Sequence, residues 1–356
     1  MKILFTVQGE GRGHFTQAVT LKQMLEANGH EVVRVLVGKS PARQLPAFFS
    51  EKINIPILTF CSPNFLPNAH NKKVNLFRTI EFNTSYLGRY IKSLNIVKEA
   101  IENSGADLVI NFYELITGLV YSIYKPKVKM IAIAHQYLFL HHKFKFPINK
   151  IAEIQTLNFF SILTSRNAAK RLALSFYPLS PDPKWSIEVV PPLLRKEVLS
   201  TKSEKGDYLH GYMLNSGFSE EIIEWHKEHP EVSLHFFWDK KDAPETLKID
   251  DTLSFHKLND QRFIEYMAGC RGYATTAGFE SVCEAFYMQK PVMMIPAHIE
   301  QECNAYDAQM AKAGIFSHKF DLSALLNYLP LYEPDNFFRL WVIEAEERIL
   351  KALETD

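Results

Sequence analysis

The chain has 356 residues, of which 47% are hydrophobic and 22% charged, a composition typical of a globular protein long enough for two domains. Its four cysteines (Cys61, Cys270, Cys283 and Cys303) include no C-x-x-C pair, which argues against a disulfide scaffold or a structural zinc site and indicates a reducing compartment. No apolar run approaches the roughly 20 residues that span a bilayer, so we expect a cytoplasmic protein.

The formal net charge of zero hides an uneven distribution along the chain. Residues 1–185 carry a net charge of +12, and the remaining residues carry −12. Between Leu115 and Ala152 there are six lysines and no acidic residue. This split suggests two domains with different partners, although an uneven solvated surface would give the same pattern.

The first half of the chain alternates between apolar runs and segments with helical periodicity. In chain order these segments predict a strand at 2–7, a helix that stops at Asn28 and Gly29, a strand at 32–38, a helix near 91–103, a strand at 106–112, a helix near 114–124 and a strand at 128–136. Strands that alternate with helices predict a parallel sheet covered on both faces.

A proline-rich segment at 175–198 is typical of a domain junction. Beyond it the alternation restarts, with strands predicted at 207–215, 232–239, 253–258, 272–276 and 291–296 and helices at 219–230, 261–270 and 278–288. A long amphipathic helix is predicted at 336–353. We therefore expect one α/β domain at 1–185, a second at 186–335 and a C-terminal helical segment at 336–356.

A glycine-rich segment at 9–14 follows the first predicted strand and ends in His14. Such a turn before a helix lets backbone N–H groups approach an anion. It departs from the dinucleotide fingerprint G-x-G-x-x-G, because its last glycine is missing and Arg34 and Lys39 stand where an acidic residue would hold a ribose. We expect His14 at a helix N-terminus, which keeps an imidazole neutral and suits a general base; the alternative is a tight turn with a capping histidine.

A second group of candidate residues lies at 275–305. A strand is predicted to end at Thr275 and Thr276, Gly278 permits a turn, and the helix that follows is expected to carry Ser281 and Glu284 in its first turn. Amides at that helix N-terminus can hold a phosphate, and the carboxylate can accept two ribose hydroxyls. The alternative, a Ser-x-x-Glu capping box, does not explain the polar residues behind the next strand, which are Glu300, Gln301 and Asn304.

Together the two motifs resemble those of nucleotide-sugar glycosyltransferases of the GT-B fold, in particular the peptidoglycan N-acetylglucosaminyltransferase and UDP-glycosyltransferase families. The G-x-G-x-G-H loop of these families matches residues 9–14. Their carboxy-terminal pattern matches Gly278, Ser281, Glu284, Ala285, Pro296, Glu300, Gln301, Asn304 and Ala305. The resemblance implies two Rossmann-like α/β domains that face each other across a cleft, with the C-terminal helix returning to the N-terminal domain.

The resemblance also implies roles for individual residues. Glu284 would hold the ribose, and amides at the start of its helix would hold the diphosphate. The implied donor-binding residues are Gly11, Gly13, Asn215, Gly217, Leu258, Thr276, Ala277, Gly278, Phe279, Glu280, Ser281, Glu284, Glu300 and Gln301. His14 would be the catalytic base with Glu114 as an alternative or orienting group, and His135 and Gln136 would line the acceptor side.

Metal chemistry is not expected, because no two aspartates stand two residues apart as in a D-x-D motif. Oriented helix amides can stabilise a departing diphosphate instead, so we predict neither a metal nor a cofactor. The adjacent His141 and His142 lack the spacing of a zinc site and are expected at the surface.

The basic stretch 139–150 interleaves aromatic residues with lysines and histidines. It fits either a peripheral contact with an anionic membrane surface or an exposed loop whose aromatic rings pack inward. No RNA-binding motif accompanies it, so we expect no nucleic-acid partner.

These observations predict a metal-independent, inverting glycosyltransferase. It would move a hexosyl or N-acetylhexosaminyl group from a nucleotide sugar, a UDP-sugar first, to a glycan, lipid-linked or small-molecule acceptor in cell-envelope glycan biosynthesis. Membrane contact would place it at the inner face of the membrane. The alternatives are a sugar-nucleotide epimerase of the same fold and a non-catalytic sugar-nucleotide binding protein.

Overall fold

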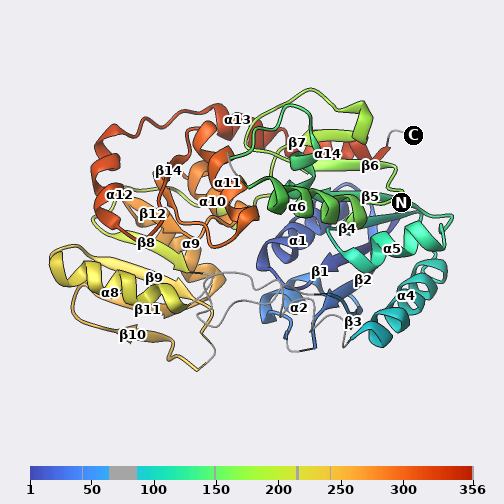
Figure 1. Ribbon diagram of the computed structural model, residues 1–356, viewed down its shortest axis with the longest axis horizontal. Helices are drawn as coiled ribbons and strands as arrows, with labels where there is room; N and C mark the ends of the chain where they lie inside the picture. Colours follow the sequence, from blue (N-terminus) through green and yellow to red (C-terminus); the bar gives the residue numbers. More distant parts are fainter. Residues whose placement is uncertain (42, 64–85, 148–149, 214–215, 241, 355–356) are drawn as a thin grey trace. The chain divides into compact units, whose positions relative to one another are not determined.

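The computed structural model describes residues 1–41, 43–63, 86–147, 150–213, 216–240 and 242–354 (Figure 1). These residues form two compact units. Unit 1 comprises the described residues up to Leu193 together with 341–354, and unit 2 comprises those of Leu194–Leu340. Each unit is an α/β assembly with its own sheet.

Unit 1 contains a seven-stranded sheet in the order β3-β2-β1-β4-β5-β6-β7. Every neighbouring pair in it is parallel. The strands are β1 (Lys2–Gln8), β2 (Glu31–Lys39), β3 (Ile57–Cys61), β4 (Leu108–Phe112), β5 (Lys129–Ala134), β6 (Lys170–Leu174) and β7 (Ile187–Val190). Five consecutive residues of β1 are buried, so both faces of the sheet are covered.

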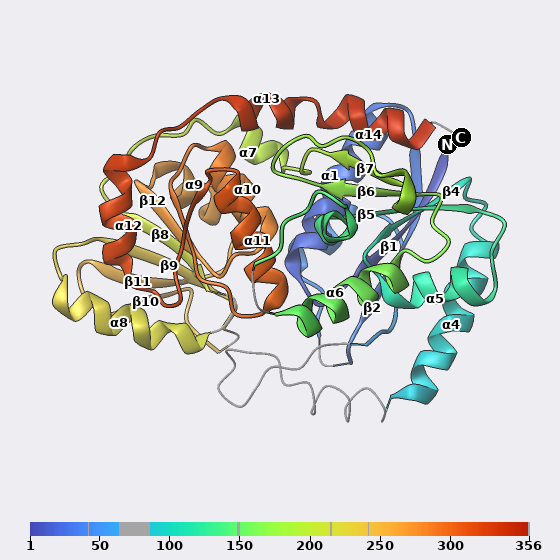
Figure 2. The same ribbon diagram turned by 45° about the horizontal axis from the view of Figure 1, so that its top comes forward.

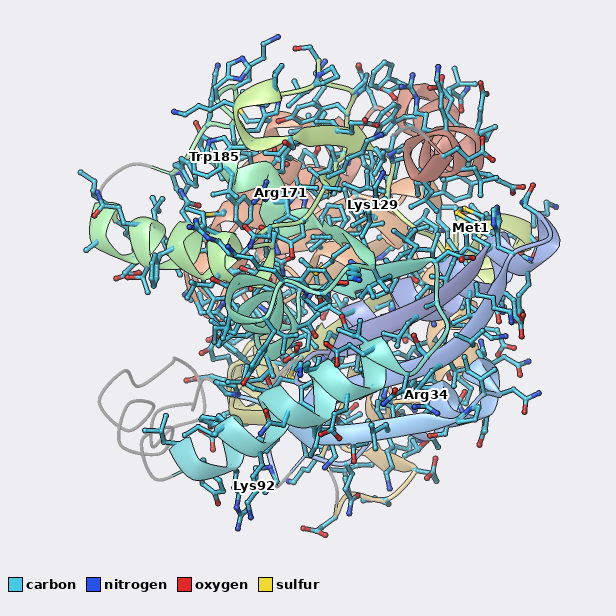
Figure 3. All side chains as sticks on the ribbon, turned by 90° about the vertical axis from the view of Figure 1, so that its right-hand side faces the viewer. Met1, Arg34, Lys92, Lys129, Arg171 and Trp185 are labelled. Atoms are coloured by element: carbon cyan, nitrogen blue, oxygen red, sulfur yellow. The ribbon has the colours of Figure 1, made fainter. Side chains whose placement is uncertain are left out.

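The helices of unit 1 follow its strands in alternation. They are α1 (Arg12–Ala27), α2 (Ala47–Ile53), α4 (Leu87–Glu102), α5 (Leu115–Ile123), η1 (His135–Leu140), α6 (Ile151–Thr164), η2 (Pro183–Trp185) and α14 (Ala345–Glu354). On one face, α4 and α5 bury Val97 and Val120 against a cluster that includes Leu4 of β1. Figure 3 looks onto this unit and shows Lys92 on the outer side of α4.

Unit 2 contains a second seven-stranded sheet, in the order β10-β11-β9-β8-β12-β13-β14. Its strands are β8 (Leu209–Met213), β9 (Leu234–Trp238), β10 (Thr246–Lys248), β11 (Leu253–Lys257), β12 (Gly272–Thr275), β13 (Val292–Met294) and β14 (Gly314–Phe316). All pairs are parallel except that of the edge strand β10, which is antiparallel to β11.

The helices of unit 2 are α7 (Lys196–Ser200), η3 (Ser216–Phe218), α8 (Ser219–Glu228), α9 (Asp260–Gly269), α10 (Phe279–Tyr287), α11 (Ile299–Met310), α12 (Leu322–Tyr328), η4 (Leu329–Leu331) and the first part of α13 (Phe337–Ile343). Helices α8 and α12 bury Ile222 and Leu325 in one cluster with Phe236 and Phe255 of the sheet. Figure 2 shows these two helices beside the same sheet.

The predicted α/β class and the alternation of strands and helices are confirmed in both units. The proline-rich segment at 175–198 was interpreted as a domain junction, but it also contributes a strand. Within it, Ile187–Val190 forms β7, which pairs with β6 and completes the sheet of unit 1. Unit 1 therefore continues to Leu193 and not to residue 185.

The long helix predicted at 336–353 is two helices, α13 and α14, with a break at Glu344. The stacked rings of Phe338 and Phe286 lie within unit 2. Trp341, which belongs to unit 1, donates its indole N–H to the carbonyl of Ser175 at 2.9 Å. Helix α14 packs on β7, and Lys170 donates to the carbonyl of Ala352 at 3.1 Å.

None of the helices in the described ranges is long and apolar enough to cross a membrane.

A buried histidine makes the stability of unit 2 dependent on pH. His210 of β8 lies fully buried among aromatic rings, including Phe263 and Tyr273. Burial lowers its pKa from 6.5 to about 3, although a hydrogen bond to the carbonyl of His235 opposes the shift. The unfolded chain therefore takes up a proton between these pKa values that the folded chain does not. The contribution of His210 to stability is complete above pH 6.5 and is lost as the pH falls toward 3.

We expect unit 2 of the wild type to lose about 2 kcal/mol of unfolding free energy through this group between pH 7.5 and pH 5. His210→Phe should remove that part of the pH dependence, because phenylalanine does not titrate. The exposed His318 provides the control, and the unfolding free energy of His318→Phe should change with pH as much as that of the wild type. Urea denaturation at both pH values measures the unfolding free energy. An equal change between the two pH values in all three proteins would contradict the assignment of this pH dependence to His210.

Candidate functional site

The glycine-rich segment connects β1 to α1 in unit 1. The N–H of Gly9 donates to the carbonyl of Gly38 in β2 at 2.8 Å. A Cβ at Gly9 would lie 2.8 Å from the same oxygen, so this close approach requires glycine. Helix α1 begins at Arg12 with Gly11 as its N-cap. Because glycine has no side chain to accept from the first amides, the positive end of α1 is not capped by its own N-cap residue.

His14 is the third residue of α1 and is buried. Its Nδ1 lies 3.3 Å from Oε1 of Gln17, one turn along the helix. An amide oxygen can only accept, so Nδ1 carries the proton and Nε2 carries the lone pair. This is the tautomer that a general base needs. Sequence reasoning did not identify Gln17, although its spacing of three residues places it on the same face of the helix.

Tyr113 packs against the ring of His14, with centroids 5.7 Å apart and planes inclined by 23°. Its hydroxyl lies 2.8 Å from Oγ of Ser161 in α6. The backbone of Tyr113 has φ of 59°, a left-handed conformation that is costly for a bulky residue. Strained residues of this kind concentrate at functional sites, and Tyr113 stands directly behind the end of β4.

Glu114 caps α5, which corrects its prediction as an alternative base. Its carboxylate is fully buried and accepts from the amides of Ile116 and Thr117 at 3.0 and 2.6 Å. The hydroxyl of Ser62 also donates to it at 2.7 Å. Burial raises its pKa, and the hydrogen bonds from Ser62 and Thr117 oppose that rise. A carboxylate held by these hydrogen bonds serves as the structural cap of α5.

The two residues predicted on the acceptor side are also enclosed. His135 is 1% and Gln136 6% exposed. Nδ1 of His135 donates to the carbonyl of Leu174 at 2.7 Å and ties η1 to the end of β6. Burial lowers the pKa of His135 to about 3, against this hydrogen bond. His135 therefore supports the sheet of unit 1 and does not present its ring to an acceptor.

In unit 2, the corresponding strand-to-helix turn leads from β12 into α10. Ala277 has φ of 59°, the same costly backbone conformation as Tyr113 in unit 1. Gly278 is the N-cap of α10, and Ser281 lies in the first turn with its hydroxyl donating back to the carbonyl of Gly278 at 3.3 Å. The capping-box alternative is therefore wrong, because Ser281 is not the N-cap. Amides of the first turn, those of Phe279 and Glu280 among them, belong to a helix whose N-cap has no side chain.

Glu284 lies in the second turn of α10, not the first, and forms a two-point ion pair. Nε of Arg195 lies 2.6 Å from its Oε1, and Nη2 of Arg195 lies 2.7 Å from its Oε2. The side chain of Arg195 is 11% exposed, and that of Glu284 is 3% exposed. Sequence reasoning missed Arg195, which lies near the end of the proline-rich segment.

Two polar residues of α11 hold different turns, Gln301 the turn before α11 itself and Asn304 the turn before α10. Gln301 accepts from the amide of Ala297 at 2.8 Å. Asn304 donates to the carbonyl of Ala277 at 3.3 Å, so it holds the strained residue from behind. Glu300 lies in the first turn of α11 and is partly exposed. Within the motif that resembles the family's donor-sugar pattern, Asn304 thus supports the turn before α10.

The remaining donor-side predictions are distributed over unit 2 and α1. Gly217 lies in η3, while Asn215 is outside the described residues. Leu258 follows β11 and donates its amide to the carbonyl of Trp238 at 3.1 Å. Thr276 is buried, and Gly11 and Gly13 stand at the start of α1 in unit 1.

His141, His142 and Asp182 form a cluster of metal-ligating types in unit 1. His141 is buried, which corrects its prediction as a surface residue. Its Nε2 donates to the carbonyl of Ser180 at 2.9 Å, and its Nδ1 accepts from the amide of Lys143 at 3.1 Å. His142 Nδ1 lies 2.8 Å from Asp182. With both nitrogens of His141 occupied by backbone groups, the cluster fits a polar tie between loops better than a metal site.

The aromatic residues of the basic stretch 139–150 pack inward. Phe139 and Phe144 are buried, with ring centroids 4.9 Å apart. Lys143 and Lys145 are exposed. The exposed lysines of the stretch can contact a charged partner, whereas the two buried rings cannot. The structure therefore favours the inward-packed loop over a lipid-inserting patch.

The two α/β units have seven-stranded sheets that are parallel apart from the edge strand β10, and each has an N-cap glycine before a helix that follows a central strand, as the GT-B fold class requires. Residues 1–330 match glycosyl transferase family 1. The chain belongs to that family and is a glycosyltransferase.

Solved structures share the fold of this chain. UGT2 of Phytolacca americana, complexed with UDP-2-fluoro-glucose and pterostilbene, is 13% identical over 99% of this chain and 98% of its own, with a TM-score of 0.64. The spinosyn rhamnosyltransferase SpnG with thymidine diphosphate is 12% identical over 100% of both chains, with a TM-score of 0.60. SsfS6 of Streptomyces sp. SF2575 is 14% identical over 100% of both chains, also at 0.60. No curated protein matches the chain significantly.

Proposed function

We propose that the protein is a metal-independent, inverting glycosyltransferase that uses a nucleotide sugar, with a UDP-sugar as the first candidate. The start of α10 carries this proposal: its N-cap is Gly278, and Glu284 stands in its second turn. Helix amides can hold a diphosphate, and a carboxylate can accept ribose hydroxyls. The nucleotide sugar is a substrate, and the proposal needs no cofactor.

In this proposal the transferred group is a hexosyl or N-acetylhexosaminyl group, and His14 is the base that deprotonates the acceptor hydroxyl. The tautomer set by Gln17 supports that role. The departing diphosphate would be stabilised by the α10 amides, which cost no reorganisation at the moment of transfer because they are already oriented.

The acceptor is proposed as a glycan, a lipid-linked sugar or a small molecule in cell-envelope biosynthesis. Among proteins of this fold, SpnG has been solved with spinosyn aglycone and UGT2 with pterostilbene, which favours testing small-molecule acceptors first. The exposed lysines of the stretch 139–150 support at most a peripheral electrostatic contact with an anionic surface at the inner face of the membrane.

The donor site is tested by Glu284→Gln, which keeps the shape of the side chain and removes its charge. We expect UDP affinity to fall by roughly 10–150-fold, the loss of hydrogen bonds to a charged acceptor. Calorimetry on a variant whose folding is verified by circular dichroism measures the change. Both this variant and Glu284→Ala leave the charge of Arg195 uncompensated, but Glu284→Gln keeps one acceptor oxygen for it. Unchanged affinity in Glu284→Gln would remove Glu284 from the donor site.

Chelation tests the metal independence. Transfer activity should survive EDTA, because the sequence has no D-x-D pair and the α10 amides are available for the leaving diphosphate. Activity abolished by EDTA and restored by Mn²⁺ would contradict the proposal. Product analysis in the same assay separates transfer to an acceptor from epimerisation of the donor and from binding without turnover.

A further inference from the structure

Tyr113 is a buried aromatic residue, directly behind the end of β4, to which the proposed function assigns no role. Its ring lies nearly parallel to that of His14, with centroids 5.7 Å apart and planes inclined by 23°. The hydroxyl of Tyr113 lies 2.8 Å from Oγ of Ser161, and the rings of Tyr137 and Phe160 pack against it with centroids 5.6 and 5.5 Å away. The imidazole therefore packs on a ring whose own plane is held by several contacts.

The backbone of Tyr113 indicates that the ring itself is required at this position. Its φ of 59° lies in the left-handed region, where glycine or asparagine would form the same turn at a lower cost than a bulky residue. The cap of α5 depends on the next residue, Glu114, which accepts from the helix amides. Neither the turn nor the cap needs a tyrosine, whereas the contact with His14 needs an aromatic ring.

The stacked ring favours the protonated state of His14. The face of an aromatic ring carries partial negative charge and attracts a cation that lies within about 6 Å of the ring centroid. The imidazole becomes such a cation when its Nε2 accepts a proton. Its Nδ1–H, which faces Oε1 of Gln17 at 3.3 Å, becomes a stronger donor in the same step. Both contacts are thus stronger after proton transfer than before it, and contacts of this kind accelerate a reaction.

We propose that Tyr113 is a positioning residue for His14, whose ring fixes the plane of the imidazole and stabilises the positive charge that the imidazole gains as it takes the acceptor's proton. Tyr113 acts through His14 and transfers no proton itself. This inference rests on the proposed role of His14 as the base.

The experiment measures the release of UDP from UDP-glucose by the full chain, with water or a phenol as the acceptor. Tyr113→Leu keeps an apolar side chain but removes the aromatic face. We expect kcat to fall by roughly 30-fold, the value of a desolvated cation–π contact, and KM for UDP-glucose to stay within about twofold. Tyr113→Phe keeps the face and should hold kcat within about threefold of the wild type, even though it loses the hydrogen bond to Ser161.

Tyr121 of α5 supplies a control for the loss of a buried tyrosine. It is 3% exposed, and its hydroxyl donates to the carbonyl of Val128 at 2.9 Å. Tyr121→Leu should lower the thermal stability of unit 1 as Tyr113→Leu does, because both variants remove a buried ring. Well below the unfolding temperature, however, Tyr121→Leu should keep kcat within about threefold of the wild type. Equal losses of kcat in the two variants would show a structural role for both and overturn the proposal.

A double-mutant cycle tests whether Tyr113 acts through His14. In a His14→Ala background, Tyr113→Leu should change kcat by less than about threefold, because the charge that the ring stabilises no longer forms. A fall as large as in the wild-type background would overturn the positioning role and leave the base assignment intact. If His14→Ala itself turns over like the wild type, or if the wild type releases no UDP, the proposed function fails and the inference fails with it.

If Tyr113→Leu does not fold, Tyr113→Asn is measured in the same way, because asparagine tolerates the left-handed backbone. Failure of both variants to fold would assign Tyr113 to the fold of unit 1 and overturn the proposal.

Discussion

Replacing Trp341 by alanine is expected to lower the unfolding free energy of unit 1 by about 3–5 kcal/mol, the range for a buried aromatic residue. Trp341 is 3% exposed, and its indole N–H donates to the carbonyl of Ser175 at 2.9 Å. The substitution would leave a cavity and a buried carbonyl without its donor. Urea denaturation of the variant measures the loss.

The residue just before it in the sequence provides the control. Leu340 is 61% exposed although it belongs to the same helix. Leu340→Ala should therefore change the unfolding free energy by less than about 0.5 kcal/mol. Similar losses in the two variants would show that the helical end of the chain adds nothing specific to unit 1.

The sequence predicted most strands and helices, because their patterns are local. Strand β1 is an apolar run that ends at the glycine-rich segment, and α1 ends at Asn28 and Gly29 as its stop signals indicate. Strand β7 was missed because its four residues lie between prolines, where the turn signals outweigh a short apolar run. Strands β10 and β14 have three residues each, too few to show a period.

The break between α13 and α14 has no signal in the sequence. The residues around Glu344 include neither glycine nor proline, and the apolar period continues through them. Trp341 on one side and Ala352 on the other are both held by long-range hydrogen bonds to unit 1. Tertiary contacts of this kind override local propensity and cannot be read from periodicity.

In the candidate site, too, local features were predicted from the sequence and contacts between distant residues were not. The turns from a strand through glycine into a helix, before α1 and α10, were predicted from turn chemistry and helix spacing, although α1 begins at Arg12 and not at His14. The burial of Glu114 and the pairing of Glu284 with Arg195 were not, because their partners are distant in the sequence. An acidic residue next to a predicted helix can be a cap or a functional group, and only its surroundings decide which.

His14 is the residue whose loss should affect turnover most. We expect His14→Ala to lower kcat by roughly 10²–10⁴-fold, the contribution of a positioned general base, while nucleotide affinity stays nearly constant. His14→Asn should lower kcat almost as much, because an amide keeps a polar contact but cannot take the proton. His30, which lies outside α1, supplies the control His30→Ala, which should keep wild-type turnover.

The pattern of results across these variants distinguishes the roles open to His14. If the asparagine variant retains most activity, His14 is a structural or phosphate contact and the base lies elsewhere, though not at the enclosed Glu114. If both variants lose nucleotide binding, the start of α1 is a phosphate-binding loop and the catalytic assignment fails. Gln17→Ala adds a further check, because Gln17 fixes the proton on Nδ1 of His14. Its loss should lower kcat without changing KM for the donor, since a base in the wrong tautomer still leaves the donor site intact.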